Sequence, residues 1–211
     1  AQNLLQSIIK EEKLEAKALY GIFRAKSNGE EVKLFEDQTS FYFPRQLMDK
    51  GSQPNFSLAD YISPAGDDHI GLFAVTAGHG IKNIINEYQA KNDDYSEIMA
   101  KVLADRLAEA AAEWLHKKVR TEYWGYSKNE ELDLKAMLYE KYRGIRPAPG
   151  YPACPDHKEK DKIWKLLNVE EQIGISLTES RAMFPAASVC GWYFSHPNAR
   201  YFSVLKNEVL S

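Results

Sequence analysis

The chain has 211 residues, of which 44% are hydrophobic and 27% are charged, and its formal net charge is -3 at pH 7. This balance is typical of a folded soluble protein, and it excludes the concentrated basic surface that nucleic-acid binding requires. No apolar run approaches the ~20 residues that cross a bilayer, and two cysteines are too few for a disulfide scaffold. We therefore expect a cytoplasmic protein with no nucleic-acid or membrane partner.

The first third of the chain mixes helical and strand patterns. Residues 1–17 carry apolar side chains at helical spacing and predict an amphipathic helix. Alternating apolar and polar side chains predict four strands, at residues 19–25, 31–35, 56–62 and 71–76. The turn residues Ser27, Asn28 and Gly29 separate the first two strands and predict a β-hairpin.

Helices dominate the middle of the chain, and strand patterns return at its end. Further helices are predicted at residues 95–119, at 132–142 before Gly144, and at 158–167 after the capping residue Asp156, and strands at 188–195 and 201–209. The apolar face of the longest helix is expected to comprise Ile98, Met99, Val102, Leu103, Leu107, Ala111, Trp114 and Leu115. This order predicts an α+β fold with a bent, mainly antiparallel sheet and helices grouped around it.

Two short motifs invite a functional interpretation. Gly78-His79-Gly80 lies between a predicted strand and a predicted helix, as in a dinucleotide-binding loop, but Asn83 replaces the third glycine. A tight turn is therefore the favoured interpretation. Cys154 with His157 is the nearest approach to a pair of metal ligands, and zinc needs three or four, so no metal site is predicted. No catalytic nucleophile motif is present, so no catalytic residue is predicted.

The segment Arg146–Pro155 reads RPAPGYPACP and holds four of the nine prolines. This density excludes a helix or a central strand and predicts a stiff, shaped loop. Arg146 supplies a planar guanidinium suited to a carboxylate, and Tyr151 supplies a flat ring suited to a purine or a sulfonium. On these residues alone, a ligand-binding loop and a purely structural connector remain equally acceptable.

The run YRGIRPAPGYPACPDHKEK, from Tyr142 to Lys160, resembles the R-x-x-x-G-Y-P signature of the reactivation domain of cobalamin-dependent methionine synthase. Further similar segments, in the same order along most of the chain, are NFSLADYI, IGLFAVTAG, DDYSEIMAKVLADRLAEAAAEWLH, EYWGY, LTES and GWYFSHPNARYF. The resemblance implies a single S-adenosylmethionine-binding domain over residues 1–211. It also implies truncation at the N-terminus, since a family segment with an aspartate before Trp-x-Pro-Phe-Phe is absent from this sequence.

The positions that the resemblance assigns to S-adenosylmethionine are Arg146, Ala148, Gly150, Tyr151, Tyr201 and Phe202, with Glu109 and Glu140 as acidic residues on the sulfonium side. Arg146 would hold the ligand carboxylate, and Ala148 would contact the amino-acid end through its backbone. Phe202 stands where a tyrosine is frequent and lacks the hydroxyl. For Glu109 and Glu140, a solvated helix face remains an equal alternative.

The resemblance implies that this domain is part of a larger methyltransferase and has no complete active site of its own. It would present the methyl group of S-adenosylmethionine for the reductive methylation of inactive cob(II)alamin, which restores methylcobalamin for methionine biosynthesis. Cobalamin would be carried by a neighbouring domain of the same polypeptide, zinc would be bound only elsewhere in the parent enzyme, and flavodoxin or a similar reductant would supply the electron.

Two alternatives stay open. A self-contained methyltransferase would normally show a doubly wound sheet with a glycine-rich loop, and neither pattern is evident. A non-catalytic docking module for cobalamin or for a flavodoxin-type reductant would fold in the same way but would not bind S-adenosylmethionine.

Overall fold

The computed structural model describes residues 2–48, 51–52 and 54–204. It confirms the predicted fold class, because helices and strands are mixed and the main sheet is bent and antiparallel. Five strands form this sheet in the order β3-β2-β1-β4-β7. Their bounds are Glu15–Asn28 for β1, Glu31–Leu34 for β2, Ser40–Tyr42 for β3, Asp68–His79 for β4 and Ser188–Tyr193 for β7.

The chain divides into two compact units, and it passes between them several times. The first unit holds residues 1–19, 74–115 and 168–189, and the second holds residues 20–73, 116–167 and 190–211. The boundaries fall within β1, β4 and the long helix α3 (Asp94–Lys118) and just after Val189 in β7.

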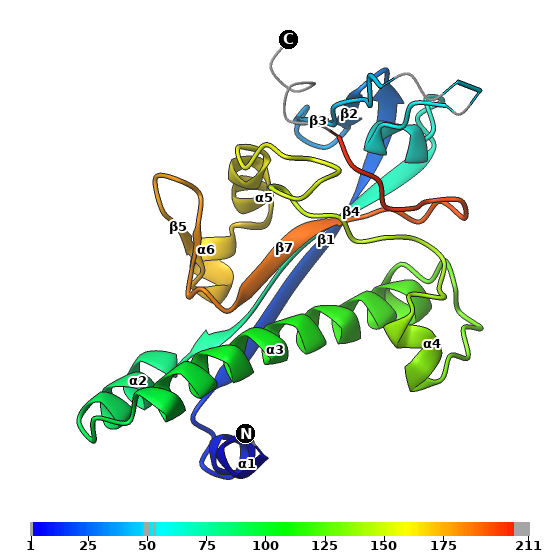
Figure 1. Cartoon of the computed structure of the whole chain (residues 1–211). Helices are drawn as coiled ribbons and strands as arrows, with labels where there is room; N and C mark the ends of the chain where they lie inside the picture. Colours follow the sequence, from blue (N-terminus) through cyan, green and yellow to red (C-terminus); the bar gives the residue numbers. More distant parts are fainter. Residues whose placement is uncertain (1, 49–50, 53, 205–211) are drawn as a thin grey trace. The chain divides into compact units, whose positions relative to one another are not determined.

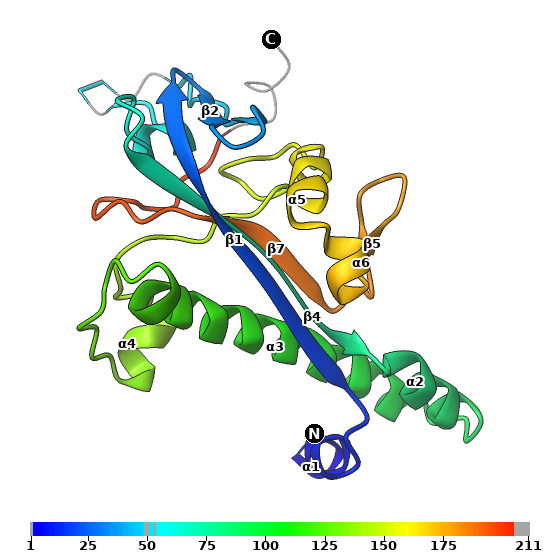
Figure 2. The ribbon, with the colours of Figure 1, turned by 180° about the vertical axis from the view of Figure 1, so that it is seen from behind.

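Three helices of the first unit share an apolar cluster. Ile8 of α1 (Gln2–Lys10), Ile84 of α2 (Ile81–Gln89) and Ala100 of α3 are buried together. Figures 1 and 2 both show α2 beside the N-terminal half of α3. The unit also contains α6 (Val169–Ile173) and a small hairpin of β5 (Ser176–Leu177) and β6 (Met183–Phe184).

The buried face of α3 is narrower than the sequence pattern predicted. Four alanines are buried at intervals of four residues, namely Ala100, Ala104, Ala108 and Ala112. Ala104 and Ala108 pack against Ala77 and Ala187, and such small side chains let a helix approach a strand closely. The prediction was therefore wrong for Ile98, Val102 and Trp114, which are exposed by 61%, 45% and 53%.

The second unit has an aromatic core. The ring of Trp192 meets Phe41 and Phe43 edge to face, with centroids 5.7 Å and 4.9 Å away, and Phe43 meets Phe194 at 5.6 Å. These geometries are favoured because the positive ring edge faces the negative ring face of its neighbour. The β1–β2 hairpin is confirmed, since Asn28 pairs with Glu31 across the turn.

Several elements differ from the prediction. The helix expected at residues 1–17 is the shorter α1, which ends at Lys10, and residues 15–17 belong to β1. The strand expected at residues 56–62 is wrong, because Ser57 and Asp60 form a capping box that starts a 3-10 helix, Leu58–Tyr61. The helix expected at residues 132–142 is the shorter α4 (Leu134–Leu138), which Asp133 caps. Residues 201–204 form no strand, and the rest of that prediction, residues 205–209, lies outside the described residues.

Helix α5 (Glu159–Leu167) follows the predicted bounds closely. Asp156 accepts a hydrogen bond from the backbone N–H of Lys158 at 2.8 Å, as a capping residue should. Within the helix, the carboxylate of Glu159 pairs with Lys162 at 2.7 Å. Just C-terminal to the proline-rich segment, the chain therefore enters a helix with a defined start.

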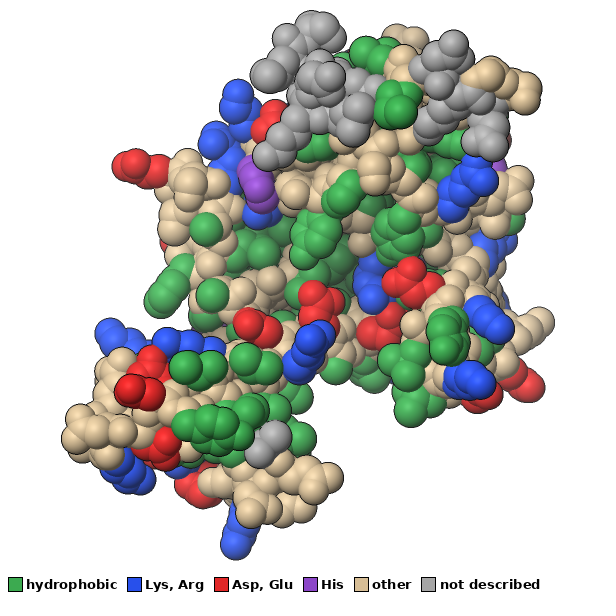
Figure 3. All heavy atoms as spheres, viewed as in Figure 1, with side chains coloured by type: hydrophobic (Ala, Val, Ile, Leu, Met, Phe, Trp, Pro, Cys, Tyr) green, Lys and Arg blue, Asp and Glu red, His purple; other side chains and the backbone are tan. Residues whose placement is uncertain are grey.

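The surface of the molecule carries both signs of charge. Acidic and basic side chains are interspersed over the face drawn in Figure 3. Over residues 2–48, 51–52 and 54–204, no helix combines the length and apolar character that a bilayer crossing needs.

Candidate functional site

The proline loop, defined as residues 146–155, folds into a compact turn. The N–H of Gly150 donates to the carbonyl of Cys154 at 2.8 Å, and the N–H of Cys154 donates to the carbonyl of Tyr151 at 2.9 Å. The N–H of Tyr151 reaches the carbonyl of Ala148 at 3.3 Å. The turn leaves the side chain of Tyr151 60% exposed, so its ring is available to a ligand. The prediction of a shaped loop is confirmed.

Gly150 occupies a position that strongly favours glycine. Its φ angle is 89°, in the region that favours glycine, and a Cβ atom built there would lie 2.0 Å from Cε1 of His157. The ring of His157 thus packs directly against the backbone of the turn. This contact explains in physical terms the glycine that precedes Tyr151.

We expect Gly150→Ala to lower the free energy of unfolding by about 1–2 kcal/mol and to lower the affinity of any ligand of the proline loop by about tenfold or more. Either the backbone leaves its φ of 89° or His157 moves. Thermal unfolding and ligand titration measure the two effects. Gly29→Ala is the matched control, because its φ is 64° but nothing lies within 4 Å of the added carbon. A Gly150 variant that binds like the wild type would contradict the expectation.

Arg146 lies at the start of the proline loop, and contacts to Nη1 hold its guanidinium in place. Its Nη1 donates to the hydroxyl of Tyr142 at 2.6 Å and lies 3.4 Å from Nδ1 of His116. Its own backbone N–H donates to the hydroxyl of Tyr201 at 3.1 Å. The side chain keeps 15% of its surface exposed, so an anion in solution can reach it.

The structure brings a second predicted segment to the same loop. The N–H of Val204 donates to the carbonyl of Pro152 at 2.7 Å, just beyond Tyr201 and Phe202. The ring of Phe202 is half-buried, with its centroid 5.9 Å from that of Phe56. Tyr201 and Phe202 therefore lie beside the proline loop although 50 residues separate them in sequence.

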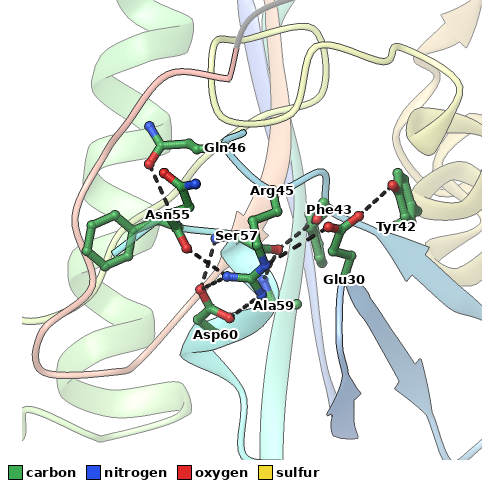
Figure 4. Close-up of polar contacts among 10 residues, drawn as sticks. Glu30, Tyr42, Phe43, Arg45, Gln46, Asn55, Ser57, Ala59 and Asp60 are labelled. Carbon is green, nitrogen blue, oxygen red and sulfur yellow. Dashed lines mark hydrogen bonds and ion pairs between the residues drawn. The ribbon is translucent and has the colours of Figure 1, made fainter. Parts of the chain in front are cut away.

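Figure 4 shows a polar network around Arg45, and the neighbouring Gln46 also contacts this C-terminal segment. The side-chain amide nitrogen of Gln46 donates to the backbone carbonyl of Ser203 at 2.7 Å. The side-chain oxygen of Gln46 accepts a hydrogen bond from the backbone N–H of Phe56 at 3.1 Å. Arg45 binds Asp60 through both terminal nitrogens, at 2.7 and 2.6 Å. A paired guanidinium and carboxylate of this geometry orders the loop that carries Gln46. These residues were not singled out from the sequence.

The two acidic candidates lie in different units. Glu140 has a φ angle of 50°, and its Oε1 lies 4.0 Å from Nη2 of Arg146 in the second unit. Glu109 lies on α3 in the first unit, where it lines a hollow of about 450 Å³ together with Asp105 and Arg106. The structure thus places Glu140 beside the predicted site residue Arg146.

The glycines of Gly78-His79-Gly80 serve local packing. A Cβ on Gly80 would lie 2.2 Å from the carbonyl oxygen of Lys13, and its φ angle is 91°. A Cβ on Gly78 would lie 2.4 Å from Cβ of Pro185. Nε2 of His79 lies 2.7 Å from the carbonyl oxygen of Ile173. These contacts support the tight-turn interpretation.

Both cysteines are buried thiols. Cys154 lies within the proline loop, where Sγ is 3.9 Å from the carbonyl oxygen of Tyr42. Burial raises the pKa of Cys154, and burial raises the pKa of Cys190 to about 12. Among the residues that the structure describes, no group of three or more histidine, cysteine, aspartate or glutamate side chains is arranged to hold a metal ion.

Sequence reasoning missed a buried polar cluster, defined as His116, Arg120, Tyr126, Glu130 and Tyr142. Arg120 is fully buried and binds Glu130 at 2.8 Å through both Nε and Nη2. Its guanidinium lies 3.7 Å from the centroid of the Tyr142 ring. The sequence did contain a signal for this cluster, because His116 and Arg120 continue the four-residue spacing of Ala108 and Ala112. A polar side chain on such a buried helix face is costly unless it is paired.

This architecture is shared with known proteins. A crystal structure described as the MetH reactivation domain bound to AdoHcy matches with a TM-score of 0.92 at 44% sequence identity, over 96% of this chain and 65% of that chain. The fold is therefore that of a reactivation domain, and this chain spans about 65% of that relative's length. The chain belongs to the family of vitamin B12 dependent methionine synthase activation domains, whose model matches residues 1–209.

Proposed function

We propose that this chain binds S-adenosylmethionine at the proline loop and presents its methyl group for the reductive methylation of cobalamin held by a neighbouring domain of a methionine synthase. Membership of the activation-domain family is the observation that carries the proposal. The AdoHcy bound to the relative supports a ligand of this chemical type, since AdoHcy is the demethylated product of that methyl donor.

The predicted site residues fit the amino-acid end of such a ligand. Arg146 is held by Tyr142, and its partly exposed guanidinium can pair with a carboxylate through two parallel hydrogen bonds. The exposed ring of Tyr151 offers a face to the purine or to the positive sulfur. Tyr201, fixed by the N–H of Arg146, closes the same part of the site.

The task of these residues is positioning. Cobalamin, when docked, would supply the nucleophilic cobalt that accepts the methyl group. The leaving group is a neutral thioether, so this chain needs neither a general acid nor a general base at the reacting carbon. Its residues must instead hold the sulfonium in line with the acceptor and leave the methyl face open. A reductant of the flavodoxin type would first supply the electron that makes the cobalt of inactive cob(II)alamin nucleophilic.

Isothermal titration of this chain with S-adenosylmethionine and with S-adenosylhomocysteine tests the proposal. We expect saturable binding of one ligand per chain for both compounds, and no measurable binding of adenosine at the same concentration, since adenosine lacks the amino-acid end. Failure of both ligands to bind would contradict the proposal and would favour a docking module that recognises only cobalamin or a reductant.

A further inference from the structure

His116 is a buried side chain that contacts the predicted carboxylate-binding arginine. Its Nδ1 lies 3.4 Å from Nη1 of Arg146, the same nitrogen that donates to Tyr142 at 2.6 Å. A guanidinium can only donate hydrogen bonds. A histidine nitrogen that faces it at this distance must therefore present a lone pair.

The contact on the other side of the ring favours the same tautomer. Nε2 of His116 lies 3.2 Å from the hydroxyl oxygen of Tyr126, so it can carry the ring proton and donate it to that oxygen. The imidazole stacks on Tyr193 with centroids 4.8 Å apart and meets Tyr142 edge to face at 5.2 Å. Packed in this way, the ring has little freedom to rotate.

The surroundings keep this ring uncharged. His116 is fully buried, and desolvation, with Arg120 and then Arg146 nearby, lowers the pKa of His116 well below its usual range. Burial also raises the pKa of Tyr126, which keeps that hydroxyl protonated. Other charged groups near the cluster are Glu130, paired with Arg120, and Glu140, 4.0 Å from Arg146. The guanidinium of Arg143 also lies 5.6 Å from the centroid of the Tyr126 ring. At neutral pH, His116 therefore acts as a neutral acceptor between two arginines.

We propose that His116 and Tyr142 are positioning residues, which together hold the Arg146 guanidinium in the orientation that receives the carboxylate of the ligand. This inference rests on the proposed function. An arginine side chain loses substantial rotamer freedom when it binds an anion, and contacts that fix it beforehand remove part of that cost. The guanidinium of Arg120 lies over the ring of Tyr142, 3.7 Å from its centroid, and helps to hold that ring in place.

Substitutions at His116 can separate positioning from packing. In His116→Asn, the amide oxygen takes the place of Nδ1 and can still accept from Arg146. In His116→Gln, the amide reaches the place of Nε2 and leaves Arg146 without that acceptor. Each variant is titrated with S-adenosylhomocysteine and with the same compound lacking its carboxylate, 5′-deoxy-5′-(3-aminopropylthio)adenosine. Any change that involves Arg146 should appear only with the first ligand.

We expect His116→Gln to bind S-adenosylhomocysteine about tenfold more weakly than the wild type, and the decarboxylated compound within about twofold of it. His116→Asn should stay within about threefold of the wild type for both ligands. Equal losses for the two ligands would mean that His116 serves packing alone, and would overturn the inference. Wild-type affinity of His116→Gln for both ligands would overturn it as well.

A measurement without ligand separates this inference from the proposed function. In the wild-type chain, ¹⁵N NMR of the His116 ring should show a proton on Nε2 and none on Nδ1 between pH 6 and 8. A proton on Nδ1 would overturn the inference whether or not the ligand binds. If neither adenosyl compound binds the wild type, the proposed function fails by itself, and the role of His116 in receiving a carboxylate fails with it.

Discussion

Replacing Arg146 with alanine is expected to weaken binding of S-adenosylmethionine to this chain by about 100-fold or more. The loss would follow from removal of the two charge-assisted hydrogen bonds that we propose Arg146 makes with the ligand carboxylate. Arg146→Lys should recover only part of the affinity, because an ammonium group is a point charge that cannot pair through two parallel bonds. Calorimetric titration measures both effects.

The matched control for Arg146→Ala is Arg24→Ala, which removes the same charge from an arginine whose guanidinium lies 5.2 Å from the centroid of the Phe35 ring, outside the predicted site. It should bind like the wild type. Unchanged affinity of the Arg146 variant, with a normal melting temperature, would remove Arg146 from the site. In an intact methionine synthase, we expect Arg146→Ala to abolish reactivation while sparing ordinary turnover.

The second large effect concerns stability. Glu130→Ala is expected to lower the free energy of unfolding by about 3–5 kcal/mol, because Arg120 would keep a buried charge without its carboxylate. The side chains of the pair are exposed by only 0% and 7%, so water cannot replace the lost partner. Urea denaturation followed by circular dichroism measures the change.

Two further variants sharpen this test. Glu122→Ala breaks the surface pair with Lys118, in which the side chain of Lys118 is 33% exposed and that of Glu122 is 52% exposed. This change should lower the free energy of unfolding by no more than about 1 kcal/mol. The double variant Arg120→Met with Glu130→Leu should recover most of the stability lost in Glu130→Ala, because it removes both charges. If Glu130→Ala and Glu122→Ala cost the same, the buried pair does not contribute as proposed.

The fold class could be predicted from the sequence because its main signals are local. Turn residues around Asn28 and Gly29 mark the hairpin, and the long amphipathic pattern marks α3 within one residue of its bounds. The 3-10 helix at Leu58–Tyr61 was missed because alternating apolar residues also suit a strand. The capping box formed by Ser57 and Asp60 decided the local conformation instead.

The candidate site was predictable only in part. The proline-rich composition of residues 146–155 predicts the shaped loop, and the family resemblance assigns Arg146 and Tyr151 their predicted roles. The approach of Tyr201 to the backbone of Arg146 depends on tertiary folding, and so does the burial of His116 beside it. Neither contact has a local pattern, because the residues involved are separated by 55 and 30 positions.

The raised pKa values of the two cysteines have a chemical consequence for the proposed role. A sulfonium compound is an alkylating agent, and thiolates are the strongest nucleophiles that protein side chains offer. Cys154 lies only three residues from Tyr151, yet burial keeps it protonated, and Cys190 with a pKa of about 12 is protonated as well. If the proposed donor binds, neither protonated sulfur is expected to compete for its methyl group, so the donor can be held without modification of the cysteines.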